Sequence, residues 1–507
     1  MKKSISRVFA VLLAMVMLVS VVCIPAIASA PKEKTVKVNY VVSGNDKSVE
    51  FKYSDAYFDQ SGYVYRQDLA IASNALAISA GGSQRARKSN DMKNQNQNFK
   101  HFASVCGFDK FASSQYMKAR PKVDSIGVNC ASKKIEDGKG KSTLIAIAIR
   151  GFGYQNEWGD NGLIGVTGDH QGFSRSRDDA LKFVKQYIRD SGIKGRIKVW
   201  VSGYSRGGIV ANMIGGSLDD GYNLGDKVTL SRDDMYVYPC EPALGVATES
   251  TKNAKYDNIH NIVNPNDLVP MVPFTSWGFA RYGIDHLTPT KADPNYDEYS
   301  SAMKDYMKSI PNDIYNIYWP DLFQGWDVQT NGTIITGISK NDKLQPEFFK
   351  DLDKAVSADL VYSRQDYVDN LQVYIMDLLE AFNREDVEVK DAGKDVLKVL
   401  ADNWQDVLQV LLSGDKDKAV NAIAGYIEEG YAKSGITNYT QEKIVKMLNV
   451  LVPRVIKMAK DYPSTTGTFI ANIVNILAAH SEAPCQSWLK TLPADYMKTH
   501  TAYSYNY

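Results

Sequence analysis

The sequence predicts an α/β fold with a mostly parallel sheet and a large helical insertion. Two continuous apolar runs, at residues 144–149 and 197–201, are typical of parallel strands buried on both faces. A helical pattern at 173–190 lies between them, and such alternation indicates a sheet covered by helices on both sides. Beyond residue 290, helical patterns dominate and strand-like runs nearly vanish. A chain of 507 residues accommodates one large domain with an insertion.

The first thirty residues have the organisation of an export signal. Three basic residues precede an apolar run at 8–24, and the A-S-A sequence at 28–30 supplies the small residues of a cleavage site. We expect cleavage near Ala30, which would release a soluble protein outside the cytoplasm. A retained membrane anchor is the alternative. Lipid attachment at Cys23 is disfavoured, because the valine before it is larger than the small residue that such processing usually needs.

Residues 31–290 are expected to form the first part of the sheet-bearing core. Alternating patterns predict a hairpin at its start, and apolar faces with helical spacing predict the helices. In order, the expected elements are a hairpin of 35–42 and 49–53, a helix at 67–80, strands at 124–131 and 144–149, a helix at 173–190, a strand at 197–201, a helix at 208–218, and strands at 235–238 and 259–263.

Residues 291–470 are expected to form a helical cap inserted into this core. The predicted helices are 299–309, 345–355, 364–382, 394–412 and 440–459. Residues 471–507 would then return to the core, which favours a cap over the alternative of a separate helical domain.

The segment G-Y-S-R-G at 203–207 indicates a nucleophile elbow, the sharp turn of α/β-hydrolases between a strand and a helix. The turn strains its serine, and glycines at 203 and 207 avoid the clashes that side chains would cause. Ser205 is therefore the predicted nucleophile. The alternative is an ordinary strand-to-helix turn.

A serine nucleophile needs a histidine base, and the base needs a carboxylate that orients it. In this fold the chain order is serine, acid, histidine. Asp267 is the expected acid because it follows the strand at 259–263 and begins a proline-flanked turn; Asp285 is the reserve.

Six histidines are available: His101, His170, His260, His286, His480 and His500. Those after Asp267 fit the order. His480 is the expected base because it stands at a helix end where the chain should re-enter the core. His286 is the second choice.

Acyl transfer also needs donors for the oxyanion. We expect the backbone N–H of Arg206, which follows the nucleophile, and that of Phe152, which follows the apolar strand at 144–149. The glycines on either side of Phe152 would let this backbone approach a substrate closely.

Several segments together resemble class 3 lipases, and the ending resembles a secreted bacterial branch of them. Two residues depart from the pattern: Tyr204 replaces the usual histidine before the nucleophile, and Phe152 replaces a small hydroxyl residue. The matching segments are R-G at 150–151, H-Q-G-F at 170–173, G-Y-S-R-G-G at 203–208, Y-P-C-E-P-A-L-G at 238–245, N-P-N-D-L-V-P at 264–270, and the ending from His480 to Trp488 and Leu489.

The resemblance implies a secreted serine hydrolase that cleaves carboxylic esters through Ser205, Asp267 and His480, with an ester or lipid as its substrate and transient contact with a lipid interface. It implies no metal and no organic cofactor. Lipase, short-chain esterase and feruloyl-type esterase stay open. A thioesterase or peptidase on the same triad, and a non-catalytic secreted binding protein with this fold, are the rivals.

Composition narrows the partners. Net charge is +1, with 23% charged and 44% hydrophobic residues, which is ordinary for a globular protein and unlike the basic surface that nucleic acid requires.

The acidic fragment at 414–418 lacks the glycine of a calcium loop. The cysteines after the signal could form disulfides or stay as buried thiols: Cys106, Cys130, Cys240 and Cys485.

Overall fold

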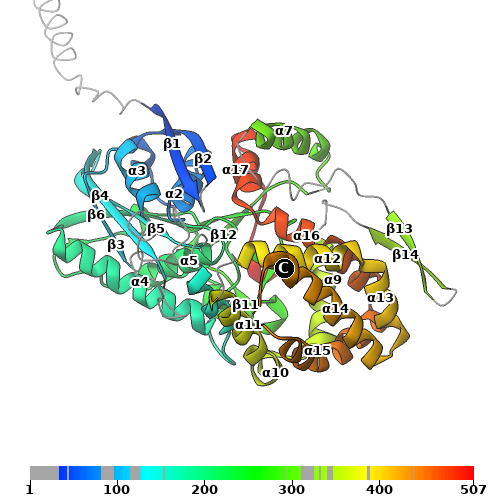
Figure 1. The fold of residues 1–507 in the computed structure, drawn as a ribbon. Coiled ribbons are helices and arrows are strands. Elements are labelled where there is room, and N and C mark those ends of the chain that lie inside the picture. The colour runs from blue at the N-terminus through cyan, green and yellow to red at the C-terminus, as the bar shows by residue number, and fades with distance from the viewer. Residues whose placement is uncertain are drawn as a thin grey trace, which may run out of the picture.

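The computed structural model describes residues 33–42, 45–81, 96–114, 126–151, 155–290, 292–309, 325–330, 333–339, 346–384, 389–437 and 439–507. Figure 1 shows two parts: a sheet with its flanking helices, and a group of helices that extends from α9 to α16 beside it. The predicted export signal at 1–30 lies outside the described residues.

The central sheet is mixed, with one strand opposite in direction to the rest. Its strand order is β3-β4-β5-β6-β7, with β8 also paired to β6. β4 runs antiparallel to both β3 and β5, and a tight turn at 137–140 joins it to β5, whereas β5, β6, β7 and β8 are mutually parallel. The strands are β3 (Lys110–Ser114), β4 (Val128–Asp137), β5 (Gly140–Ile149), β6 (Gly195–Gly203), β7 (Val228–Thr229) and β8 (Met235–Val237).

Single bridges continue this sheet beyond β8 into a smaller one. There, β10 (His260–Val263) lies parallel to β12 (Ile284–Leu287), and β15 (Thr501–Ala502) pairs with β12 in the opposite direction. A separate pair consists of β9 (Val246–Ala247) and β11 (Phe279–Ala280). The predicted N-terminal hairpin is confirmed as β1 (Lys34–Val42) and β2 (Asn45–Tyr53).

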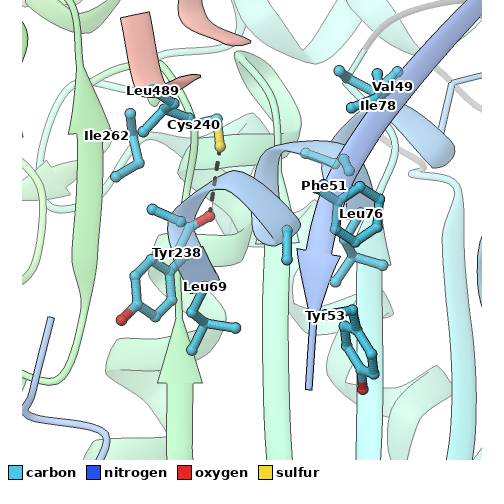
Figure 2. Close-up of a cluster of buried hydrophobic side chains, with 14 of the residues drawn as sticks. Val49, Phe51, Tyr53, Leu69, Leu76, Ile78, Tyr238, Cys240, Ile262 and Leu489 are labelled. Carbon is cyan, nitrogen blue, oxygen red and sulfur yellow. Dashed lines mark hydrogen bonds between the residues drawn. The ribbon is translucent and has the colours of Figure 1, made fainter. Parts of the chain in front are cut away.

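Alternate residues of the buried strands face opposite hydrophobic clusters, as a period of two requires. Leu144, Ala146 and Ala148 of β5 pack with the hairpin, α2 and α3, while Ile145 and Ile147 pack with α4 and α5. Figure 2 shows the first cluster, in which side chains of β2 and α2 lie near Tyr238, Cys240, Ile262 and Leu489. These helices are α2 (Gln67–Ser79), α3 (Gln97–Val105), α4 (Gln171–Asp190) and α5 (Arg206–Asp219).

The helical part is built on two further apolar clusters. Its helices are α9 (Pro346–Ala355), α10 (Arg364–Asn370), α11 (Gln372–Arg384), α12 (Val389–Asp402), α13 (Trp404–Ser413), α14 (Lys416–Ser434), α15 (Gln441–Asp461) and α16 (Pro463–Ala479). A hairpin of β13 (Gly325–Thr330) and β14 (Thr333–Ser339) projects from this part in Figure 1.

The chain rejoins the sheet-bearing part at α17 (Glu482–Thr491), which packs against α2 and against α7 (Tyr296–Ser309). α16 still packs with α12, α13 and α15, so it spans the boundary expected at residue 470. The short helices α6 (Thr248–Thr251) and α18 (Tyr496–Thr499) complete the described elements apart from short 3-10 helices and one π-helical segment. Among the described residues, every helix is too short or too polar to cross a bilayer.

Candidate active site

Ser205 stands in a strained turn between β6 and α5. Its φ of 58° and ψ of −123° place a side-chain-bearing residue in left-handed backbone, which occurs mainly where surrounding structure enforces it. The two predicted glycines are needed here. A Cβ at Gly203 would lie 2.2 Å from the carbonyl oxygen of Gly207, and one at Gly207 would lie 2.5 Å from that of Ile149. The turn at 203–207 thus has the strand-to-helix position and the strained serine that an elbow requires.

His480 brings its ring to this serine. The residue lies between α16 and α17, and its Nε2 is 2.6 Å from Ser205 Oγ. The side chain is 17% exposed, so the imidazole is sheltered and still within reach of a substrate. The ring of Tyr204, which precedes the nucleophile, lies 5.6 Å from the His480 ring and packs beside it.

Asp267 holds the other side of the same imidazole. Its Oδ2 is 2.5 Å from His480 Nδ1, and its side chain is fully buried. Because an ionised carboxylate only accepts hydrogen bonds, Nδ1 carries the proton and Nε2 is left to accept from the serine hydroxyl. The second carboxylate oxygen accepts the backbone N–H of Val269 at 2.9 Å, which fixes its orientation. The structure thus brings Ser205, His480 and Asp267 together.

His286, the second choice for the base, is engaged elsewhere. Its Nδ1 is 2.7 Å from the carbonyl oxygen of Met497, and its Nε2 is 3.0 Å from Nδ1 of His260. Burial lowers the pKa of His286 to about 4 and that of His260 to about 3, so both rings are neutral near neutral pH. These two histidines join β10 and β12 to the C-terminal segment.

Asp285, the reserve acid, pairs with an arginine. Arg281 Nη2 is 2.6 Å from its Oδ2, and both side chains are fully buried. Arg281 also donates to the carbonyl oxygens of Pro242 and Pro270, at 3.0 and 2.6 Å. Asp285 therefore supports the turn that carries Asp267.

A buried ionic network lies beside the elbow. The guanidinium of Arg206 donates two hydrogen bonds of 2.7 Å to the carboxylate of Asp160, and Arg150 pairs with Glu157 at 2.6 Å. All four side chains are almost fully buried. The sequence did not predict these two pairs, because nothing local links Asp160 or Glu157 to an arginine 46 or 7 positions away.

Of the two expected oxyanion donors, Arg206 lies among the described residues and Phe152 does not. Arg206 begins α5, so its backbone N–H lies at a helix start, where partial positive charge gathers. Phe152 lies outside the described residues. Gly151, just before it, packs tightly on the elbow: a Cβ there would lie 1.9 Å from the carbonyl oxygen of Tyr204.

The structure contains an apolar cavity of about 270 Å³ near the acid turn. It lies between the acid turn and the helical part. Leu268, one wall residue, follows Asp267 directly, and Phe469 belongs to the helix that ends before His480. The lining is Leu268, Phe274, Trp277, Leu352, Val356, Leu360, Val361, Tyr367, Leu371, Tyr374, Ile375, Met447, Leu451, Met458 and Phe469.

The four cysteines at 106, 130, 240 and 485 are free and buried. Burial raises the pKa of the Cys106 thiol to about 12. Within the described ranges, no three His, Cys, Asp or Glu side chains gather closely enough to hold a metal ion.

Comparison with known proteins gives partial structural likenesses. No protein-family model matches the chain, and no curated protein does. A triacylglycerol lipase whose catalytic centre is described as a serine protease triad is 17% identical, with 45% of this chain and 83% of that chain covered and a TM-score of 0.31. The triacylglyceride lipase of Rhizomucor miehei is 16% identical, with 45% of this chain and 83% of that chain covered and a TM-score of 0.30. A lipase from Rhizopus microsporus var. chinensis is 15% identical, with 52% of this chain and 80% of that chain covered and a TM-score of 0.27.

These structural neighbours are lipases at low identity and partial coverage. The curled mixed sheet, the elbow and the flanking helices of the chain itself are consistent with a fold of the α/β-hydrolase type.

Proposed function

We propose that this protein is a serine hydrolase that cleaves carboxylic esters through Ser205, His480 and Asp267. The observation that carries the proposal is the hydrogen-bonded line from the serine hydroxyl through the imidazole to a buried carboxylate. A strained serine elbow at the start of a helix adds to it, since this arrangement presents the hydroxyl beside helix N–H groups.

In the acylation step, Ser205 Oγ attacks the ester carbonyl carbon while His480 Nε2 takes the hydroxyl proton. The buried carboxylate of Asp267 stabilises the imidazolium that forms. The carbonyl oxygen becomes an oxyanion, which the backbone N–H of Arg206 would hold, with that of Phe152 proposed as the second donor. The tetrahedral intermediate collapses, and the alcohol leaves with the proton from His480.

In the deacylation step, water attacks the acyl-enzyme. His480 Nε2 takes a proton from the water and then returns it to Ser205 Oγ as the carboxylic acid departs. The serine and the neutral imidazole are regenerated, so the cycle needs no other reactant.

The apolar cavity favours an ester with a hydrocarbon acyl chain. Its walls carry aliphatic and aromatic side chains from the acid turn and from α9, α10, α11, α15 and α16. Burial of each methylene in such a space contributes about 0.8 kcal/mol. We therefore propose that the segment 291–470 acts as a cap that sets acyl-chain preference and contacts a lipid interface.

The direct experiment is hydrolysis of p-nitrophenyl esters from acetate to decanoate. We expect turnover in the natural chain and none above background in Ser205→Ala. His480→Ala should lose at least about 100-fold in kcat. His286→Ala should keep the kcat of the natural chain when activity is expressed per folded molecule. Equal activity in the natural chain and Ser205→Ala would remove the assignment.

The rivals give different outcomes in the same assay. Faster turnover of acyl thioesters than of matched esters, or cleavage of peptide p-nitroanilides, would point to a thioesterase or a peptidase. No turnover of any acyl substrate would favour a binding protein on this fold.

We also propose that the protein acts outside the cytoplasm after removal of residues 1–30. Mass spectrometry of the protein recovered from culture medium should give a chain that begins near Pro31. An intact N-terminus on protein that stays with the cells would contradict this.

A further inference from the structure

Glu241 is the second strained residue of the described chain. Apart from Ser205, it is the one non-glycine residue in those ranges with a positive φ, 44°. Its side chain is fully buried. Strained backbone persists where neighbouring groups hold it in place, and such residues gather at functional sites. The contacts of Glu241 show what holds it.

On one side, the segment of Glu241 is bonded to the nucleophile elbow. The carbonyl oxygen of Cys240 accepts the backbone N–H of Ser205 at 2.9 Å. The N–H of Cys240 in turn donates to the carbonyl oxygen of Gly203, also at 2.9 Å. The residue before Glu241 therefore holds both the strand end and the strained serine.

On the other side, Glu241 is bonded to the acid turn. Its own N–H donates to the carbonyl oxygen of Ile262 at 2.8 Å, and Cys240 and Ile262 adjoin in the interior (Figure 2). Its Oε2 accepts the N–H of Asn264 at 2.8 Å. The carbonyl oxygen of Asn264 then accepts the N–H of Asp267 at 3.0 Å.

A continuous line of hydrogen bonds therefore joins the backbone of the nucleophile to the backbone of the acid, and Glu241 is its centre. We propose that Glu241 is a positioning residue, which fixes the acid turn relative to the elbow and so sets the geometry of Ser205, His480 and Asp267. The proposal rests on the proposed hydrolase function. Glu241 itself touches none of the reacting atoms.

The surroundings of the carboxyl decide its charge. Asp267 acts on it from the acid turn, Cys485 from α17 and Cys240 from its own segment, while Tyr204 lies beside it in the elbow. Burial, and then the negative charge of Asp267, raise the pKa of Glu241 well above its ordinary value. The raised pKa favours the neutral form of Glu241, and that form accepts the Asn264 N–H without a second negative charge beside the one that orients His480.

Two substitutions distinguish the role of the Glu241 carboxyl from that of its strained backbone. Glu241→Gln keeps the shape, the neutral charge and an oxygen that can accept from Asn264. Glu241→Gly removes the side chain and suits the positive φ, so it eases the strain while it deletes the link to the acid turn.

The primary measurement is the rate constant for reaction of Ser205 with a fluorophosphonate, in which Oγ bonds to phosphorus, fluoride leaves and His480 takes the proton. This constant describes each reactive molecule, so it does not depend on how many molecules are folded. The kcat and KM for a p-nitrophenyl ester, and the thermal unfolding midpoint, accompany it.

We expect Glu241→Gly to lower both the labelling rate constant and kcat by about 10- to 100-fold, with KM within about threefold, since small misplacements of catalytic groups have such effects. Glu241→Gln should stay within about threefold of the natural chain in both.

The proposal would be overturned if Glu241→Gly keeps the labelling rate constant and kcat of the natural chain, or if both variants lose them equally. Either result counts against the proposal even if Ser205→Ala is inactive and the hydrolase function holds. Absence of labelling at Ser205 in the natural chain would overturn the proposed function, and this inference with it. A lower unfolding midpoint with unchanged rate constants would make Glu241 structural only, which also contradicts the proposal.

Discussion

Asp160 and Arg206 place opposite charges in the interior next to the nucleophile. Their two hydrogen bonds fix the side chain of the residue whose backbone N–H is the proposed oxyanion donor. A buried pair of this kind contributes modest net stability when intact, but the loss of one partner leaves an uncompensated charge in the interior. The pair therefore makes the elbow sensitive to substitutions outside the reacting groups.

We expect Asp160→Ala to lower the free energy of unfolding by about 3–5 kcal/mol, because it removes the carboxylate that accepts two hydrogen bonds from the buried Arg206 guanidinium and leaves this group a 3.6 Å contact with Glu157. The matched control is Asp178→Ala, which removes a carboxylate that is 53% exposed and paired with Arg177. That change should stay within about 1 kcal/mol. Denaturant unfolding measures both, and equal effects would contradict the importance of the buried pair.

Asp219 gives a pH dependence with a definite sign. Burial raises its pKa to about 7. The folded protein therefore keeps a proton that the unfolded chain releases near pH 4, and stability falls as pH rises from about 4 to about 7. Asp219→Asn lacks this ionisation and can still accept the hydrogen bond from Asn258.

The unfolding free energy of Asp219→Asn should match that of the natural chain near pH 4 and exceed it by on the order of 2–4 kcal/mol at pH 8. Unfolding in denaturant across this range measures the difference. A difference that stays constant or shrinks as pH rises would contradict a raised pKa at Asp219.

At this scale, sequence order and local context located Ser205, Asp267 and His480, because each stands at the end of a recognisable element. Glu241, Glu157 and Arg281 could not be assigned roles in the same way. Their partners are fixed by folding: Glu241 meets Asn264 from a neighbouring strand, and Arg281 reaches Pro242 across the interior.

Among the elements, strong apolar runs and amphipathic helices were predicted well. The hairpin β1–β2, α2, α4, β6 and α5 appear within a few residues of their expected bounds. The reversed direction of β4 was not predicted, since an antiparallel neighbour leaves the apolar run of β5 unchanged.

The helical part departed from expectation in four places. The helix expected at 364–382 breaks at Leu371 into α10 and α11, and that at 394–412 breaks at Asn403 into α12 and α13. α14 was not predicted, because its many alanine and glycine residues weaken the contrast between an apolar and a polar helix face. The hairpin β13–β14 was also missed.

Two glycines of α14 provide a test of helix packing. A Cβ at Gly430 would lie 2.4 Å from Cα of Val396 in α12, whereas a Cβ at Gly425 would meet nothing within 4 Å. Alanine is favoured over glycine in a helix by about 1 kcal/mol, and overpacking costs about 1–3 kcal/mol.

Gly430→Ala should therefore lower the free energy of unfolding by about 1–2 kcal/mol, while Gly425→Ala raises it by up to about 1 kcal/mol. Denaturant unfolding followed by helical circular dichroism compares the two. Stabilisation by both substitutions would show that α12 and α14 do not approach closely at Gly430.

At the scale of the whole molecule, the sheet-bearing part contacts the helical part. The apolar cavity lies at this contact, and α11 packs on the turn Gln155–Gly162 that carries Asp160. Sequence patterns predicted a helical insertion but gave no information on this cavity, because its walls come from segments about 200 residues apart.

Filling the cavity should change acyl-chain preference. Leu371→Trp adds volume to its wall, so hydrolysis of a decanoate ester should fall at least about tenfold relative to acetate. Val373→Trp is the control, because Val373 lies two residues further along the chain, is 63% exposed and should leave the ratio unchanged. An unchanged ratio in Leu371→Trp would place the acyl chain elsewhere.

The most direct measurement of the central claim is the identity of the residue that reacts with a fluorophosphonate, read by mass spectrometry of the digested protein. The account predicts label on Ser205 in the natural chain, none in Ser205→Ala, and labelling at least about 100-fold slower in His480→Ala. Label on another residue, or the same rate without the imidazole of His480, would contradict it.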